Sequence, residues 1–253
     1  MKLEGAGTIV TGGASGLGAG TVKALAEAGA KVTIFDLNED WGTKLAADVG
    51  GQFAKVDVTR EADVSAGLET AIAAHGPVRV LVNCAGIAIG EKTTGRGKPH
   101  SLESFTKVIQ VNLIGTFNTI RLVATHMVGT QALDDDERGV IVNTASVAAF
   151  DGQIGQVAYS ASKGGIVGMT LPIARDLSAK GVRVCTIAPG LFKTPMMDTL
   201  PEHIQEALGA MVPFPHRLGT AGEYAALARH ICENVMLNGE IIRLDGAVRL
   251  QPK

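Results

Sequence analysis

Short apolar runs alternate with helix-periodic segments along the whole chain of 253 residues. The runs are rich in β-branched residues and apolar at successive positions, which is typical of parallel strands buried on both faces. They predict strands over residues 7–11, 31–36, 52–56, 78–83, 139–144, 182–187 and 240–244. The segments between them predict helices over residues 16–28, 39–49, 61–75, 101–128, 156–180 and 221–234.

This alternation favours a single α/β domain over residues 1–253. Right-handed crossovers would build a Rossmann-type, doubly wound parallel sheet of about seven strands with helices on both faces. Two connections, residues 89–100 and 130–138, are longer than this topology requires. Residues 194–215, with four prolines and a short helical pattern, predict a lid over the substrate.

Charge and composition narrow the classes of function. The chain has 23 Lys+Arg against 25 Asp+Glu and no long basic block, which argues against a nucleic-acid partner. No apolar run reaches the ~20 residues of a membrane span, and the first strand follows Met1 closely, so a cytoplasmic protein without a membrane partner is expected. Its three cysteines, Cys84, Cys185 and Cys232, are too scattered for a disulfide framework or a metal site.

A glycine-rich turn joins the first predicted strand to the first predicted helix. Residues 8–18 spell T-I-V-T-G-G-A-S-G-L-G. Glycines let the backbone approach a pyrophosphate, and the helix N-terminus supplies N–H groups and a partial positive charge. The predicted cofactor contacts here are Gly12, Ser15, Gly16, Leu17 and Gly18. The alternative is a helix entry that binds nothing.

The ends of the next strands complete the predicted dinucleotide site. Asp36 lies 18 residues after Gly18, where a carboxylate can hold the adenosine ribose. The carboxylate would repel a 2′-phosphate, and no arginine or lysine lies within the next seven residues, so NAD is favoured over NADP. Strand ends that would border the rest of the cofactor carry Asp57, Val58, Cys84, Ala85 and Gly86. A helix-capping role is the alternative for Asp36.

A second group of residues predicts acid–base chemistry. Tyr159 and Lys163 are spaced i and i+4 on one predicted helix and share a face, and Ser146 follows the fifth strand. An ammonium near a phenol favours the phenolate and lowers its pKa from about 10. Tyr159 could then exchange a proton with a carbinol or carbonyl oxygen that Ser146 also binds, while Lys163 holds the nicotinamide ribose. A surface pair is the alternative for Tyr159 and Lys163 taken without Ser146.

Together these motifs resemble the short-chain dehydrogenases/reductases over essentially the whole chain. The matching residues are Thr11, Gly12, Gly16, Gly18, Asn83, Ala85, Gly86, Asn112, Ser146, Tyr159, Lys163, Pro189 and Gly190. Cys84 stands where the family usually has a second asparagine. The resemblance implies that Asn112 joins the catalytic set and holds a relay water. It also implies that Thr194 and Phe192 lie at the nicotinamide carboxamide.

The segments T-A-S-V-A-A-F, Y-S-A-S-K-G-G-I-V-G and T-I-A-P-G-L-F are similar to those of type II 3-hydroxyacyl-CoA dehydrogenases. This implies NAD-dependent oxidation of a 3-hydroxyacyl-CoA to a 3-ketoacyl-CoA. The alternatives are a hydroxysteroid or secondary-alcohol dehydrogenase on the same site, an NADPH-dependent reductase, which Asp36 disfavours, and a non-catalytic dinucleotide-binding regulator. A regulator would not require Ser146, Tyr159 and Lys163 together.

An acyl-CoA ester as the small-molecule substrate calls for cations, because CoA carries several phosphates. Lys92, Arg96 and Lys98 lie in the insertion at 89–100 and are the predicted CoA contacts, with a merely solvated loop as the alternative. Gln156 joins Ser146 and Tyr159 as a predicted substrate contact.

The helices at 101–128 and 156–180 have wide apolar surfaces, and three glycines in the second helix allow a close approach. By the resemblance, they pair with their copies in a homotetramer. Burial against the sheet of the same chain is the alternative.

Overall fold

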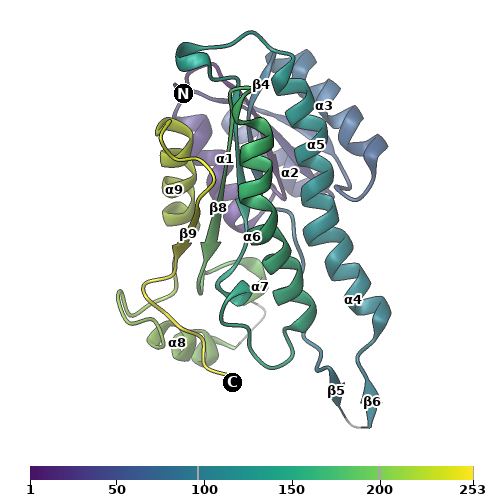
Figure 1. Cartoon of the computed structure of the whole chain (residues 1–253). Helices are drawn as coiled ribbons and strands as arrows, with labels where there is room; N and C mark the ends of the chain where they lie inside the picture. Colours follow the sequence, from purple (N-terminus) through teal and green to yellow (C-terminus); the bar gives the residue numbers. More distant parts are fainter. Residues whose placement is uncertain (96, 199–200, 253) are drawn as a thin grey trace.

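A computed structural model describes residues 1–95, 97–198 and 201–252. One parallel sheet with the strand order β3-β2-β1-β4-β7-β8-β9 confirms the predicted doubly wound architecture (Figure 1). Its strands are β1 (Gly7–Thr11), β2 (Lys31–Asp36), β3 (Gln52–Lys55), β4 (Val78–Asn83), β7 (Gly139–Thr144), β8 (Val182–Pro189) and β9 (Ile241–Leu244). Each predicted strand is present, and β8 runs two residues farther than predicted.

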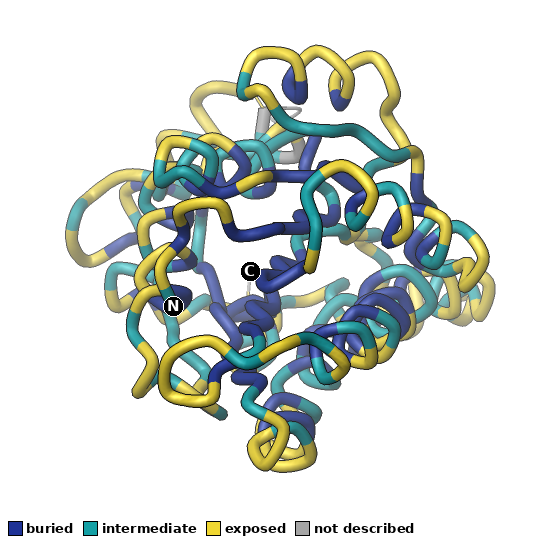
Figure 2. The backbone as a smooth tube through the Cα atoms, turned by 90° about the horizontal axis from the view of Figure 1, so that it is seen from above, coloured by how far each residue is buried: buried dark blue, intermediate teal, exposed yellow. Residues whose placement is uncertain are grey.

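Helices cover both faces of the sheet. One face carries α1 (Gly16–Glu27), α2 (Glu39–Val49) and α9 (Ala221–Glu233), and the other carries α3 (Glu61–His75), α5 (Gly115–Val128) and α6 (Val157–Ser178). Successive strand residues point to opposite faces, so Val10 packs in the first core and Ile9 in the second. Both cores are buried beneath exposed outer helix faces, which explains the uninterrupted apolar strands (Figure 2).

The helix predicted over 101–128 is divided. It consists of α4 (Leu102–Ile109), a π-helical turn (Gln110–Ile114) and α5, which together form one long rod beside α6 (Figure 1). Asn112 lies within the π-helical turn and is fully buried. Such turns are rare and concentrate at functional sites. Within the described parts of the chain, no helix is long and apolar enough to cross a membrane.

The insertion at 89–100 forms a small hairpin, with β5 (Thr94–Gly95) antiparallel to β6 (Lys98–Pro99). Arg96 lies outside the described residues. Glu91 fixes the base of the hairpin, because its carboxylate accepts a hydrogen bond from Ser101 N at 2.7 Å and lies 3.2 Å from His100 Nδ1. The insertion is therefore anchored at its base.

The predicted lid region contains two helices, α7 (Pro195–Asp198) and α8 (Glu202–Ala210). Residues 199 and 200, between them, lie outside the described residues. Thr194 and Pro195 begin the region next to the glycine-rich turn, since a Cβ on Gly16 would lie 3.3 Å from Pro195 Cδ.

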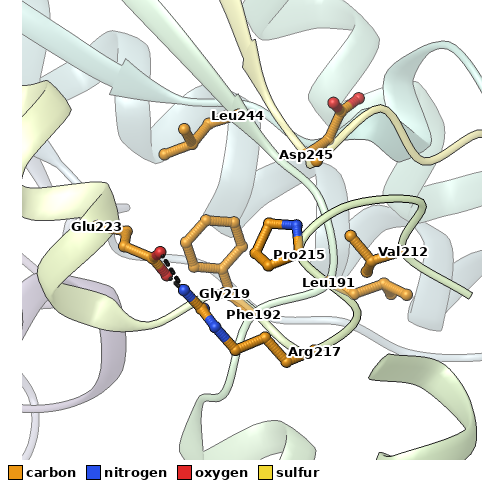
Figure 3. Close-up of a pocket in the computed structure, with 10 residues that line it drawn as sticks. Leu191, Phe192, Val212, Pro215, Arg217, Gly219, Glu223, Leu244 and Asp245 are labelled. Carbon is orange, nitrogen blue, oxygen red and sulfur yellow. Dashed lines mark hydrogen bonds and ion pairs between the residues drawn. The ribbon is translucent and has the colours of Figure 1, made fainter. Parts of the chain in front are cut away.

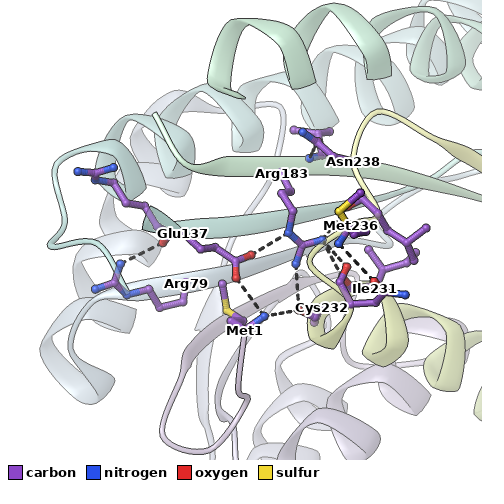
Figure 4. A network of polar contacts seen from close by, with 12 residues as sticks. Met1, Arg79, Glu137, Arg183, Ile231, Cys232, Met236 and Asn238 are labelled. Atoms are coloured by element: carbon purple, nitrogen blue, oxygen red, sulfur yellow. Dashed lines mark hydrogen bonds and ion pairs between the residues drawn. The ribbon is translucent and has the colours of Figure 1, made fainter. Parts of the chain in front are cut away.

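Buried charges close the amino ends of the central strands (Figure 4). The Arg183 guanidinium pairs with Glu137 at 2.8 Å and donates to the backbone carbonyls of Ile231, Cys232 and Leu237. Glu137 also lies 3.0 Å from the amino group of Met1. Paired charges thus fill the amino edge of the sheet, and the opposite edge is formed by the carboxyl ends of the strands.

Candidate active site

A cleft of about 910 Å³ opens at the carboxyl edge of the sheet. The strand order reverses between β1 and β4, and ligands of such folds bind in the crevice at this switch point. The predicted site residues that line the cleft are Gly12, Ser15, Gly16, Leu17, Gly18, Asp36, Asp57, Val58, Cys84, Ala85, Gly86, Ser146, Tyr159, Lys163, Phe192 and Thr194. The fold thus brings both predicted halves of the site together.

Other predicted residues lie outside the lining of this cleft. Asn112 is buried behind it, and the Gln156 side chain is engaged with Gln153, whose backbone N–H donates to Gln156 Oε1 at 3.0 Å. Lys92 and Lys98 are exposed on the hairpin.

Several residues of the lining were not predicted as site residues from the sequence. They are Phe35, Leu37, Val56, Thr59, Ile87, Lys107, Gln110, Val111, Thr144, Ala145, Pro189, Gly190, Pro195 and Met197. Lys107 matters most, because Lys107 and Lys163 are the two cations of the lining among the described residues. Its position one turn before the π-helical turn follows no motif, so only the fold reveals it.

The glycine-rich turn leaves no room for side chains. A Cβ on Gly12 would lie 2.7 Å from the Ala85 backbone, and one on Gly18 would lie 2.1 Å from the Gly12 carbonyl oxygen. Gly12 also has a φ of 61°, which favours glycine. Ser15 precedes α1 without making a side-chain cap, so its hydroxyl and the first N–H groups of the helix remain available to an anion. These features fit the pyrophosphate of a dinucleotide.

The Asp36 carboxylate is fixed between two backbone segments. Its oxygens accept hydrogen bonds from Ala14 N at 3.0 Å and from Asn38 N at 2.9 Å. The cap of α2 is Asn38, which accepts from Trp41 N, so the capping alternative for Asp36 is wrong. Each carboxylate oxygen retains lone-pair capacity for a ribose hydroxyl.

A chain of buried hydrogen bonds links the strand ends to Lys163. Asn83 donates to Asn143 Oδ1 at 2.9 Å, Thr144 Oγ1 donates to the Asn83 carbonyl at 2.6 Å, and Lys163 Nζ donates to the Thr144 carbonyl at 2.7 Å. Lys163 is only 5% exposed. Burial lowers the pKa of its ammonium to about 8, because a cation is costly away from water.

Tyr159 corrects one expectation. Burial raises the pKa of its phenol above the ordinary value, and a hydrogen bond with Ser146 offsets this only in part. Lys163 Nζ lies 5.7 Å from the centre of the Tyr159 ring and donates to the Thr144 carbonyl. The protein's own groups therefore favour the neutral phenol, contrary to the predicted lowering of its pKa by Lys163.

Asn112 joins three elements. Its Oδ1 accepts from Ile87 N at 2.8 Å, and its Nδ2 donates to the Ile87 carbonyl at 2.8 Å and to Ser162 Oγ at 3.0 Å. The side chain therefore ties the loop after β4 to α6 at Ser162, three residues after Tyr159 on that helix.

The Cys84 side chain packs against Thr144 and Tyr224. Its sulfur lies 3.6 Å from Thr144 Oγ1 and 3.7 Å from the Tyr224 hydroxyl. Burial raises the pKa of its thiol, so a reactive thiolate is disfavoured.

Phe192 separates the cleft from a second, smaller pocket. This pocket measures about 210 Å³ and shares Phe192 with the cleft (Figure 3). An Arg217–Glu223 ion pair, 2.7 Å long, lies in its wall. A Cβ on Gly219 would lie 2.7 Å from the Phe192 ring, so this glycine fixes where the ring packs. In the described part of the chain, no cluster of three or more His, Cys, Asp or Glu side chains could hold a metal ion.

The low pKa of Lys163 predicts a specific dependence of stability on pH. Between about pH 8 and about pH 10.5, the folded chain binds fewer protons at Lys163 than the unfolded chain, so its stability rises through this window. The Lys163→Met substitution removes the ammonium and with it this contribution to the pH dependence of stability. The free energy of unfolding of the unmodified protein should therefore increase relative to that of the variant across the window, as measured by urea denaturation without cofactor. A difference that is constant with pH would contradict the assignment.

The family model for short chain dehydrogenase matches residues 7–205. Proteins named 3-hydroxyacyl-CoA dehydrogenase type-2 are similar: that of Drosophila melanogaster is 55% identical, covering 99% of this chain and 100% of its own, and that of Homo sapiens is 54% identical, covering 99% and 98%.

Solved structures agree with these relatives. The crystal structure of 3-hydroxyacyl-CoA dehydrogenase type-2 from Mycobacterium avium superposes with a TM-score of 0.95 at 43% identity, covering 98% of both chains. The 3-ketoacyl-(acyl-carrier-protein) reductase from Brucella melitensis, complexed with NADH, gives a TM-score of 0.87 at 29% identity, covering 98% of this chain and 100% of its own. The chain belongs to the short chain dehydrogenase family.

Proposed function

We propose that the protein is an NAD-dependent oxidoreductase that converts a 3-hydroxyacyl-CoA to the 3-ketoacyl-CoA. The observation that carries the proposal is the presence of Ser146, Tyr159 and Lys163 in one cleft with the glycine-rich turn. Relatives at 54% and 55% identity over almost the whole chain bear the corresponding name. The neighbour complexed with NADH supports a nicotinamide dinucleotide as the cofactor.

Each residue of the proposed active site has a separate role in the reaction. A nicotinamide dinucleotide held by the glycine-rich turn, Asp36 and Lys163 would, in its oxidised form, supply the hydride acceptor and a positive charge in the cleft. That charge favours the Tyr159 phenolate, which takes the proton of the carbinol oxygen. Ser146 donates a hydrogen bond to the same oxygen and fixes its position. Lys163 holds the cofactor ribose, and Asn112 maintains the loop after β4 and the predicted relay water.

NAD is proposed over NADP because of the surroundings of Asp36. The carboxylate is held by two backbone N–H groups and would repel a 2′-phosphate. Lys55, its register partner on β3, pairs instead with Glu39 at 3.3 Å. The next lysine along the chain, Lys44, is exposed and lies outside the lining of the cleft.

A single assay tests activity, substrate and cofactor together. Reduction of NAD and of NADP is followed with 3-hydroxybutyryl-CoA, a hydroxysteroid and a simple secondary alcohol. We expect the highest kcat/KM with NAD and the CoA ester. Tyr159→Phe keeps the ring but removes the acid–base oxygen, so it should lower kcat by about 100-fold or more while NADH affinity changes less than about threefold. Near-normal turnover by this variant, or a preference for the steroid or alcohol, would contradict the proposal.

The lid at 194–215 is proposed to close over the substrate. Thr194, Pro195 and Met197 line the cleft, and α8 continues the same segment. Closure would exclude water from the reacting carbon.

The CoA phosphates are proposed to meet the hairpin. Lys92 and Lys98 are exposed there, and the hairpin is anchored to the segment between Ser146 and Tyr159 through Glu91, whose N–H donates to the Gly155 carbonyl at 2.9 Å. Arg96, between them in sequence, adds a third cation to the proposed contact.

Replacing Lys92, Arg96 and Lys98 with alanine should raise KM for 3-hydroxybutyryl-CoA several-fold, and more at low salt than at high salt, because screening weakens phosphate contacts. KM for an uncharged alcohol should stay unchanged. A matched control removes three exposed lysines outside the cleft lining: Lys23, Lys44 and Lys180. If both triple variants behave alike, the hairpin does not recognise CoA.

A homotetramer is proposed from the exposed apolar surface of α4, α5 and α6. Leu102, Phe117 and Leu171 on these helices, and Ile114 on the π-helical turn between α4 and α5, are exposed large apolar residues. A Cβ on Gly164 or Gly168 would meet nothing within 4 Å, so α6 offers a flat surface for close helix packing. Sedimentation at micromolar concentration should show four chains per particle. A Gly164→Arg variant should dissociate the particle, and a monomeric unmodified protein would contradict the proposal.

A further inference from the structure

Residues 147–156, which we name the connecting segment, join the two groups that act on the reacting oxygen. The segment starts directly after Ser146, whose Oγ accepts from Ala148 N at 3.1 Å. It ends at Gln156, the residue before α6, the helix that carries Tyr159. The path of this segment therefore affects the placement of both Ser146 and Tyr159.

Contacts from distant parts of the chain hold the connecting segment. Gln153 Nε2 donates to the Gln251 carbonyl at 2.9 Å, and Ile154 N donates to the Pro252 carbonyl at 3.0 Å. The Gly155 carbonyl accepts from Glu91 N. The remaining contact is ionic and comes from β9: Arg243 Nη2 lies 2.5 Å from Asp151 Oδ2.

The Arg243 guanidinium makes several contacts at once. Besides Asp151, it pairs through Nε with Asp245 at 2.7 Å and donates through Nη2 to the Val248 carbonyl at 3.1 Å. Its central carbon lies 5.3 Å from the centre of the Phe150 ring, a stacking distance. A planar fork with several donors can serve two carboxylates and a ring together, which a lysine cannot.

Asp245 lines the second, smaller pocket and lies close to Gly190, which lines the cleft. It follows β9 directly and lies beside Leu244 (Figure 3). A Cβ on Gly190 would lie 2.8 Å from Asp245 Cβ, and Gly190 N donates to the Leu244 carbonyl at 2.9 Å. Gly190 lines the cleft, so Arg243 connects the segment after Ser146 with the segment that follows β8.

We propose that Arg243 is a positioning residue that sets the substrate side of the site by clamping the connecting segment to the wall at Gly190. The inference rests on the proposed function, since it concerns how the acyl substrate of that reaction is placed. Arg243 and Asp151 are each about one-fifth exposed, so water screens their pairing only in part. Without the Arg243 contacts, residues 150–152 lose their ionic contact with β9. The connecting segment beside the substrate side of the site then becomes more mobile, while the glycine-rich turn keeps its structure.

Arg249 provides a matched control. It also pairs with Asp245, at 3.1 Å, and donates to the Val248 carbonyl at 2.7 Å. In the described part of the chain, Arg249 contacts neither Asp151 nor Phe150, so it shares the Asp245 contact of Arg243 and lacks the contacts with the connecting segment. Arg249→Gln and Arg243→Gln each remove one positive charge that pairs with Asp245.

The test compares kcat, KM and NADH affinity for the two variants. Arg243→Gln should lower kcat/KM for 3-hydroxybutyryl-CoA about tenfold, chiefly by raising KM, with NADH affinity changed less than twofold. Arg249→Gln should change each quantity less than twofold. Asp151→Asn leaves the pairing of Arg243 with Asp245 in place and should change kcat/KM in the same direction as Arg243→Gln. This variant tests the proposal even if the Arg243→Gln protein fails to fold. Equal effects of Arg243→Gln and Arg249→Gln, or a parallel loss of NADH affinity, would overturn the proposal.

Hydrogen exchange separates this inference from the proposed function. Amides of the connecting segment should exchange faster in Arg243→Gln than in Arg249→Gln, whatever substrate the enzyme accepts. If the unmodified protein does not oxidise the CoA ester, the proposed function fails while faster exchange still supports the clamp. Unchanged exchange in the segment overturns the clamp even where the activity is as proposed.

Discussion

The buried ammonium of Lys163 is the constraint on which the site depends. A cation that is nearly inaccessible to water needs a strong acceptor, and here the Thr144 carbonyl at the end of β7 provides it. Lys163 can reach this carbonyl only if α6 lies directly over the end of β7. The position of α6 then fixes Tyr159, one turn earlier on the same helix, relative to Ser146 after the same strand.

The neighbouring elements accommodate the same ammonium. Asn83 and Asn143 are register partners on β4 and β7, and their side chains share a hydrogen bond beneath the site. A Cβ on Gly86 would lie 3.2 Å from Asn112 Oδ1 and 3.6 Å from Lys163 Nζ, so a small residue is needed where the loop after β4 passes the lysine. The register of β4 and β7, the loop after β4 and the position of α6 are thus all constrained by the Lys163 ammonium.

Much of this arrangement could be predicted from the sequence, because strands buried on both faces leave long apolar runs and their polar ends mark one edge of the sheet. Residues such as Asp36 and Ser146 were found in this way. Features that depend on the three-dimensional surroundings of a residue were not predicted from the sequence. The direction of the Tyr159 pKa follows from burial, Lys107 enters the cleft only through the packing of α4, and Arg243 meets Asp151 across a separation of 92 residues.

The π-helical turn at Asn112 has a consequence for the phase of the long rod formed by α4 and α5. A π turn holds more residues than an α turn, and one additional residue rotates everything beyond it by about 100° about the helix axis. The apolar stripe of α5, with Ile120 and Val123, can then face the sheet while α4 turns its own stripe toward α6. Removing one residue from this turn would rotate α5 relative to α4, so that the apolar faces of both helices point to the same side. The rod could then no longer pack α5 against the sheet and α4 against α6 at once.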